Sequence, residues 1–233
     1  KNPDIVRKIY RVAVESIEGE THEYYGFFHD NPDAVLQRSV KVMRLFAGTL
    51  GRLKKLAGDN KGKFESDGFA AFFAMMEREL DDSYFQTMQY HLGELEFKNG
   101  ILVSAELGEG SAGVHMVLRK PNEAKRSWKE RIFAQKPPSF TLTVNPRDEA
   151  GIRALSELEN KGLNLVANPL AQSADHILSF FKMVRAELGF YIGCLNLREK
   201  LGQLGEPVAF PVPLPAGERR LAFHEMYDVC LSL

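Results

Sequence analysis

The stretch from residue 174 to residue 198, ADHILSFFKMVRAELGFYIGCLNLR, contains an apolar stripe with the period of an α-helix. The stripe consists of Ile177, Phe181, Val184, Leu188, Tyr191 and Leu195. We expect this helix to begin beyond Pro169 and to run to Leu201, just before Gly202. At 1.5 Å per residue, roughly 30 residues would form a rod about 45 Å long, which is longer than a compact domain usually needs. The stretch therefore predicts a strut.

Three Asn-Pro dipeptides mark further helix starts, because asparagine caps a helix and proline fits its first turn. They begin at Asn2, Asn31 and Asn145. We expect the first helix to end near Glu18 and the second near Ala57, with Gly58 as a left-handed C-cap. The third helix should end at Gly162.

The second predicted helix has an apolar stripe formed by Leu36, Val40, Met43, Ala47, Leu50 and Leu53. From Gly68 a further helix follows, and Asp82 or Ser83 can cap its continuation. Aromatic residues at helical spacing, such as Phe69, Phe72 and Phe73, indicate packing in a core rather than a cofactor site.

The period changes after residue 93. Leu95 and Phe97 alternate with polar residues up to Asn99-Gly100, a strong hairpin-turn signal, and residues 101–103 form an apolar run beyond it. Residues 114–118 and 140–144 are two more candidate strands. The sequence therefore predicts a mainly α fold with a small antiparallel β-sheet. We expect a helical core part over 1–93, the sheet with a basic loop over 94–145, and long lever helices over 146–233.

Composition limits the classes of function. The formal net charge is −1, so contact with DNA has to be local, and no apolar run is long enough to span a membrane. Two cysteines, Cys194 and Cys230, in apolar patterns fit a reducing compartment, and we expect a cytoplasmic protein. The chain starts with Lys1 rather than Met and stops in an apolar run, which favours a piece of a longer protein.

Two clusters of basic residues are candidates for DNA contact, because Lys and Arg beside phosphates displace condensed counterions. One lies on the second predicted helix and the other in the loop after residue 118, where a basic segment could follow a backbone without reading sequence. The candidate residues are Arg38, Lys41, Arg44, Arg119, Lys120, Lys125, Arg126, Lys129 and Arg131. A solvated surface explains each cluster at least as well.

The sequence identifies no catalytic, cofactor-binding or metal-binding residue. No G-x-x-x-x-G-K-S/T phosphate loop occurs, and the six histidines lack the spacing of zinc sites. Gly108, Gly110 and Gly113 match the dinucleotide fingerprint G-x-G-x-x-G, but the residues that follow alternate like a strand, whereas the fingerprint requires a helix. A glycine-rich turn between strands explains these residues better.

Several segments, in order, resemble blocks of MutS-type DNA mismatch repair ATPases. They are NPDIVRKIY (2–10), LFAGTLGRLKKLAG (45–58), residues 91–121, NPRDEAGIRAL (145–155), residues 174–197 and HEMYDVCLSL (224–233). The resemblance covers nearly the whole chain and consists of helix-packing residues. It implies the core and lever region that precedes the ATPase domain.

The resemblance implies a non-catalytic fragment that couples ATP-driven motion to DNA binding. ATP and Mg²⁺ would bind to the parent protein and not to this fragment. The implied partners are DNA, the parent's own C-terminal ATPase domain and, for the parent, a second copy in a homodimer. The alternative is a helical scaffold or protein-interaction module that does not bind nucleic acid, which the near-neutral charge favours.

Overall fold

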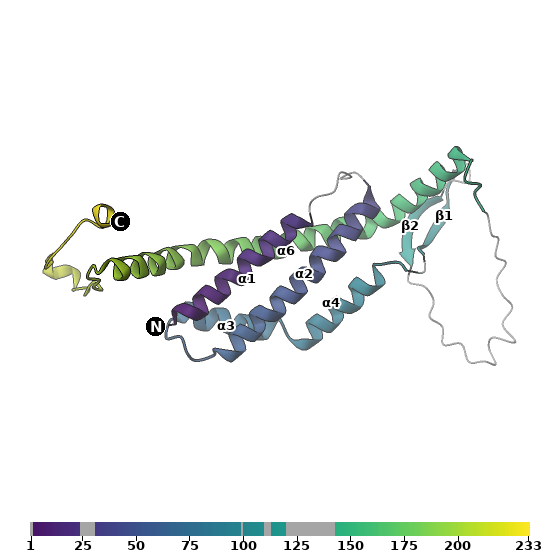
Figure 1. Cartoon of the computed structure of the whole chain (residues 1–233). Helices are drawn as coiled ribbons and strands as arrows, with labels where there is room; N and C mark the ends of the chain where they lie inside the picture. Colours follow the sequence, from purple (N-terminus) through teal and green to yellow (C-terminus); the bar gives the residue numbers. More distant parts are fainter. Residues whose placement is uncertain (1, 24–30, 99, 110–112, 120–142) are drawn as a thin grey trace.

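The computed structural model describes residues 2–23, 31–98, 100–109, 113–119 and 143–233 (Figure 1). The long helices are α1 (Pro3–His22), α2 (Pro32–Asp59), α3 (Asp67–Glu79), α4 (Asp82–Glu94) and α6 (Glu149–Leu204). The strands β1 (Leu102–Leu107) and β2 (Gly113–Arg119) pair antiparallel, and the short helices η2 (Ala216–Glu218) and α7 (Val229–Ser232) follow α6. The predicted fold class, mainly helical with a small antiparallel sheet, is confirmed.

Helix α6 is one helix of 56 residues that crosses the whole fold (Figure 1). At 1.5 Å per residue it is about 84 Å long, nearly twice the predicted strut. The predicted stop at Gly162 and the predicted start beyond Pro169 are both wrong, because the helix continues through both residues. It ends at Leu204 rather than Leu201, with Gly205 in the left-handed conformation at a φ of 80°.

Tertiary packing explains why Gly162 does not end the helix. Gly162 is buried, and a Cβ atom at this position would lie 2.9 Å from Cγ2 of Val103 in β1. Glycine therefore lets α6 approach the sheet closely, which offsets its low helix propensity. Pro169 lies between the buried residues Ala167 and Ala174, so packing of these turns offsets the helical hydrogen bond that proline cannot donate.

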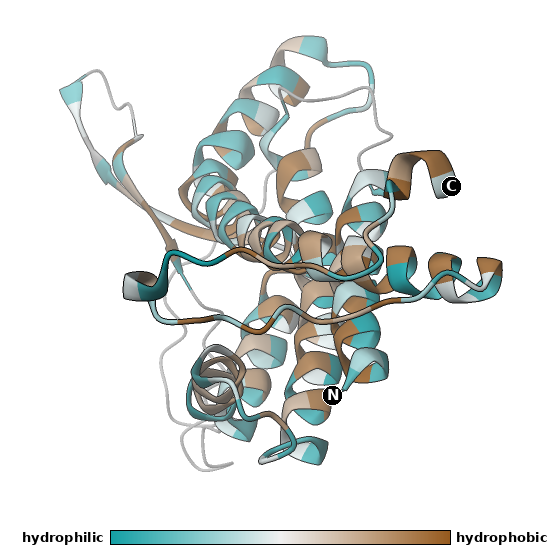
Figure 2. Ribbon diagram, turned by 90° about the vertical axis from the view of Figure 1, so that its left-hand side faces the viewer, coloured by the Kyte–Doolittle hydropathy of each residue, from teal (hydrophilic) through white to brown (hydrophobic). Residues whose placement is uncertain are grey.

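The main core lies where α6 packs against α1 and α2. All six residues of the predicted stripe on α2 are buried, which confirms that prediction. At the centre, the rings of Phe46 and Phe181 lie 5.7 Å apart, and both side chains are fully shielded from water. Viewed along the rod, the helices turn their hydrophobic residues toward one another and their hydrophilic residues outward (Figure 2).

The shorter helices α3 and α4 pack against α2, and each has an N-cap. The Ser66 hydroxyl accepts a hydrogen bond from the Phe69 amide, and the Asp81 carboxylate accepts one from the Tyr84 amide. The predicted start near Gly68 and the predicted continuation after residue 81 are confirmed to within a residue or two. The aromatic residues of α3 pack against the core as predicted.

The sheet differs from the predicted one in its pairing. Residues 95–98 do not form a strand, since the Leu95 amide still bonds the carbonyl of His91 at the end of α4. The amide of Gly100, with a φ of 87°, bonds the Phe97 carbonyl in a turn that leads from α4 to β1. The hairpin instead joins β1 to β2, and Leu102 pairs with Arg119. Of the predicted fourth strand, residues 140–142 lie outside the described part and residues 143–144 are not in a strand.

Two predicted helix ends are also too early. α1 continues past Glu18 to His22, and α2 continues through Gly58 to Asp59. Asn60 is the C-cap of α2, and the left-handed glycine is Gly62, with a φ of 79°. None of the helices in the described part of the chain is both long enough and apolar enough to cross a membrane.

Candidate functional site

The three candidate DNA-contacting residues on α2 differ in their partners. Arg38 Nη2 lies 2.5 Å from the Glu20 carboxylate of α1, and Arg44 forms an ion pair with Glu96, just beyond α4. Lys41 is exposed and has no ion-pair partner among the described residues. Of these three cations, Lys41 is therefore the one whose charge is not neutralised by an ion pair among the described residues.

Other basic residues on and just after α2 also pair with neighbouring helices. Arg52 meets Glu15 of α1 at 2.7 Å. Lys54 and Lys61 meet Asp82 of α4 and Glu77 of α3, each at 2.6 Å. Exposed pairs of this kind stabilise a protein by only about 0.2–1 kcal/mol each. Together they still neutralise much of the positive face that the sequence suggested for nucleic acid.

The electrostatics around Glu96 show the same neutralisation. A hydrogen bond from Lys98, together with the nearby charge of Arg44, holds the pKa of the Glu96 carboxyl below its usual range. Because Glu96 stays ionised, it attracts Arg44 at neutral pH. This carboxylate lies far from Arg44 in sequence, and no local pattern indicates the pairing.

Of the candidate residues in the second basic cluster, Arg119 lies in the described part of the chain. Arg119 is exposed at the end of β2, and its Nε donates a hydrogen bond of 3.2 Å to the Ser104 hydroxyl of β1. The other members lie outside the described residues: Lys120, Lys125, Arg126, Lys129 and Arg131. The hairpin thus places the first cation of this cluster where β2 ends, opposite Leu102, and in Figure 1 this end of the sheet lies away from the start of α6.

The glycine-rich segment does not have the structural context of a dinucleotide fingerprint. Gly108 follows β1 and Gly113 begins β2, so the glycine-rich segment connects two strands instead of opening a helix. This agrees with the predicted turn and lacks the helix N-terminus that binds a dinucleotide phosphate. Within the described ranges, no three His, Cys, Asp or Glu side chains gather where they could hold a metal ion.

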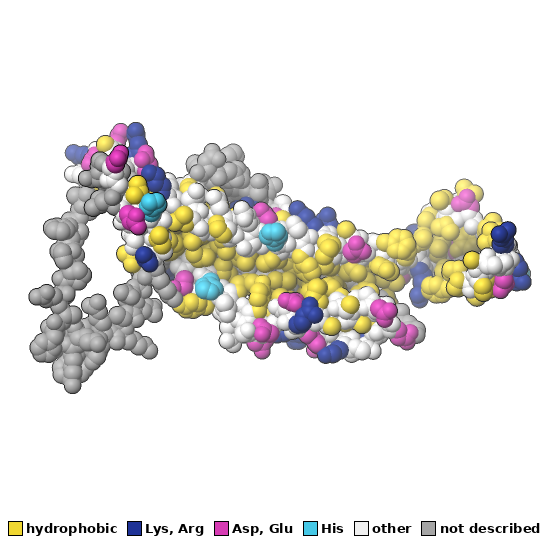
Figure 3. All heavy atoms as spheres, turned by 180° about the vertical axis from the view of Figure 1, so that it is seen from behind, with side chains coloured by type: hydrophobic (Ala, Val, Ile, Leu, Met, Phe, Trp, Pro, Cys, Tyr) yellow, Lys and Arg dark blue, Asp and Glu magenta, His cyan; other side chains and the backbone are white. Residues whose placement is uncertain are grey.

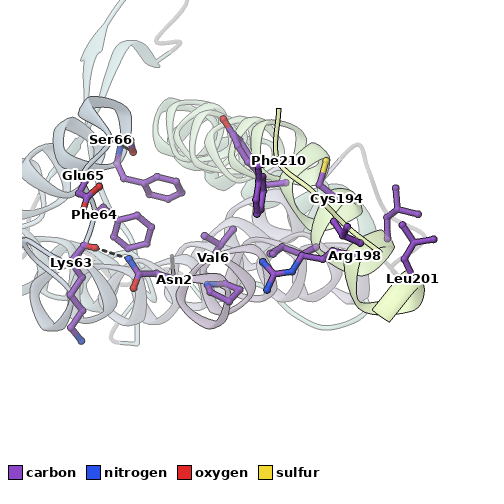
Figure 4. A pocket seen from close by; sticks show the side chains of 16 residues that line it. Asn2, Val6, Lys63, Phe64, Glu65, Ser66, Cys194, Arg198, Leu201 and Phe210 are labelled. Carbon is purple, nitrogen blue, oxygen red and sulfur yellow. Dashed lines mark hydrogen bonds between the residues drawn. The ribbon is translucent and has the colours of Figure 1, made fainter. Parts of the chain in front are cut away.

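An apolar groove, which the sequence did not indicate, runs between α6 on one side and α1 and α3 on the other. Seen from behind, a band of hydrophobic side chains follows the length of the bundle (Figure 3). Two adjoining hollows, of about 830 and 490 Å³, share Ser66, Phe69 and Tyr191. The larger hollow lies beside the end of α6, and Arg198 brings a positive charge to it, whereas the Lys63 side chain points away from it (Figure 4).

The groove is shaped by the ends of several elements. The Asn2 side chain donates a hydrogen bond of 2.6 Å to the Lys63 carbonyl, which ties the start of α1 to the loop before α3 (Figure 4). On the other wall, Cys194 and Leu201 belong to the last turns of α6. Tyr191 belongs to the predicted apolar stripe of α6, but here its side chain is 53% exposed.

These features define a helical rod protein: one long helix, supported by a bundle at its middle, carries a β-hairpin and forms one wall of an apolar groove. The family model of the MutS2 N-terminal domain matches residues 1–204, and the chain belongs to the MutS2 family. The predicted resemblance is thus confirmed for MutS2, and not for the core and lever of mismatch repair proteins in particular. Neither the curated proteins nor the solved structures give a match.

Proposed function

We propose that this chain is the non-catalytic lever of a MutS2-family ATPase, which couples nucleotide-driven movement at one end of the rod to DNA contact at the other. ATP and Mg²⁺ would act in an ATPase domain outside this chain, since no phosphate loop occurs in the sequence. Coupling of this kind requires an element with two positions that both ends can bias.

The observation that carries the proposal is the continuity of α6. A rigid helix about 84 Å long displaces its far end when its near end moves, whereas two helices joined by a loop would absorb the movement. α6 stays helical through Gly162 and Pro169, the two positions where the sequence suggested a break.

The hairpin end is the proposed DNA-contacting end. Arg119 projects there, and the loop that follows it adds Lys120, Lys125, Arg126, Lys129 and Arg131. The cations of α2 are weaker candidates, because Arg38 and Arg44 already meet carboxylates. We therefore expect the loop to contribute most of the salt-dependent affinity and Lys41 to contribute little.

Titration of duplex and branched DNA at several salt concentrations tests the DNA half of the proposal. Affinity should fall steeply with salt, and each lost phosphate contact should lower the slope of log K against log salt by about 0.9. Changing Arg119, Lys125 and Arg126 to Ala should reduce that slope. The matched control K41A removes an exposed cation and should leave it nearly unchanged. Binding that is absent, or independent of salt, refutes DNA contact.

The coupling half has its own test. The reading frame of the gene beyond Leu233 should encode a G-x-x-x-x-G-K-S/T loop that follows a strand and opens a helix. In that longer protein, ATP should change DNA affinity. A downstream sequence without a phosphate loop refutes the coupling.

A helical scaffold that binds another protein is the second candidate, and a specific observation favours it. The groove exposes apolar side chains, while the ion pairs of α2 remove charge that DNA would need. The DNA titration also separates these two functions, because a scaffold should show no salt-dependent binding to either form of DNA.

A further inference from the structure

The apolar core that holds α6 stops well before the helix does. Phe181, Val184 and Leu188 are the last in a series of buried residues, and the next buried residue is Leu201. All residues from 189 to 200 belong to the described part, and each of them is exposed or half-buried. The last four turns of α6 are therefore attached by less apolar packing than the turns before them.

Two glycines lie directly at this boundary. A Cβ atom at Gly189 or at Gly193 would meet nothing within 4 Å, so no close contact requires glycine at either position. This differs from Gly162, where the neighbouring strand leaves no room for a side chain. Glycine is the poorest helix former apart from proline, so the helix is weakest where the core stops.

A polar contact holds the segment beyond the glycines against α1. Arg7 Nη1 donates a hydrogen bond of 2.7 Å to the Asn196 side chain, and Arg7 Nη2 lies 2.8 Å from the Glu199 carboxylate. The Nη2 atom is shielded from water, and Glu199 is the carboxylate that balances its charge. Contacts of this kind depend on geometry and salt, so they can open and re-form without unfolding of the core.

We propose that residues 189–204 of α6 form a hinged segment that pivots at Gly189 and Gly193 and is latched to α1 by Arg7. Opening the latch would move one wall of the apolar groove, since Tyr191, Cys194 and Arg198 all belong to this segment (Figure 4). The latch sets whether the end of the rod moves with the bundle or independently of it. The inference deepens the proposed lever function.

Distance measurement by pulsed electron paramagnetic resonance on the 233-residue chain tests both the hinge and the latch. The native cysteines are changed to serine (C194S and C230S), and spin labels are placed on K55C in α2 and K200C in α6, where both lysines are exposed. We expect one narrow distance population in this background. In R7A the population at a longer distance should rise about tenfold, which corresponds to about 1.4 kcal/mol. E199Q keeps the shape of the side chain and should shift the populations in the same direction.

Three controls make the result specific. R52A removes an ion pair between α1 and α2, rather than one between α1 and α6, and should not change the distances. Adding G189A and G193A to R7A should restore the narrow population, whereas adding G48A and G51A, where side chains also have room, should not. Circular dichroism confirms that each variant is folded.

The possible outcomes decide the proposal. Unchanged distances in both R7A and E199Q overturn the latch, and a broad distribution that survives G189A with G193A overturns the hinge. Because the measurement uses neither DNA nor nucleotide, the lever function can fail while the hinge stands, and the hinge can fail while DNA binding and coupling stand.

Discussion

At the scale of single residues, the Asp81 carboxylate at the start of α4 links stability to pH. Its Oδ1 accepts hydrogen bonds from the Tyr84 amide at 2.7 Å and from the Ser83 hydroxyl at 2.9 Å. These bonds lower the pKa of Asp81 below its usual value. A depressed folded-state pKa means that the carboxylate stabilises the fold above the unfolded pKa of about 3.9, and that this stabilisation is lost as the pH falls through the folded pKa.

We predict that D81N keeps much of the cap but removes this pH dependence, and that D81A loses both. Thermal unfolding between pH 7 and pH 3 measures the effect. The difference in Tm between the parent and D81N should shrink as the pH falls, because the parent loses its ionised cap. A difference that stays constant down to pH 3 contradicts the assignment.

A second residue-scale prediction concerns the ring contact at the centre of the bundle. Phe46 and Phe181 are both inaccessible to water, so truncating either side chain to alanine should cost about 3–5 kcal/mol in the free energy of unfolding. Phe190 is the matched control, since it is 75% exposed on the same helix as Phe181. F190A should change stability by less than about 0.5 kcal/mol. Urea unfolding at 25 °C measures all three, and equal losses in F181A and F190A would show that the assigned core is wrong.

At the scale of elements, the fit between α6 and the sheet gives a third prediction. In G162A the new methyl group would lie 2.9 Å from Val103 Cγ2, and overpacking of this kind costs about 1–3 kcal/mol. The smaller side chain of V103A should recover part of that loss, which a double-mutant cycle measures as a coupling energy. G48A in α2, where a Cβ atom meets nothing within 4 Å, is the control and should stabilise the helix. Additive effects of G162A and V103A would contradict direct contact.

The same glycine shows where sequence patterns predict elements well and where they do not. The stripe on α2 is local, so its spacing alone predicted all six buried positions. The continuity of α6 is not local. It depends on Val103, which belongs to a strand distant in sequence, and no periodicity of residues 149–204 indicates that this strand will cover Gly162.

The hairpin was misplaced for a similar reason. Apolar and polar residues alternate around Leu95 and Phe97 over too few positions to distinguish a strand from the end of a helix. The hydrogen bond from the Leu95 amide to the His91 carbonyl shows that the helical pattern continues to Leu95. The candidate site was equally hard to predict. The acids that neutralise Arg38 and Arg44 lie in other elements, and the apolar groove forms only when three helices come together.

At the scale of the whole molecule, α6 determines where the chain can act. The bundle of α1 and α2 supports its middle, the hairpin contacts it at Gly162, and the groove and proposed hinge lie toward its end (Figure 1). The hairpin and the larger hollow of the groove thus meet α6 at different places, at Gly162 and between Tyr191 and Leu201. A change at one end reaches the other only if the helix between them stays rigid.

That rigidity gives the fourth prediction, for the shape of the chain in solution. A compact protein of 233 residues would have a radius of gyration of about 17 Å. A helix about 84 Å long requires a larger radius, and the longest dimension in small-angle X-ray scattering should reach at least that length. A concentration series separates an extended single chain from association, because only association depends on protein concentration.

Proline variants test the same rigidity. Substituting proline for Leu178, within the supported stretch, should shorten the longest dimension or unfold the bundle. Proline at Ser156, beyond the bundle, should bend the rod while leaving the thermal unfolding of the core nearly unchanged. A radius near 17 Å for the parent chain would mean that α6 folds back on itself, and such a molecule could not act as a lever.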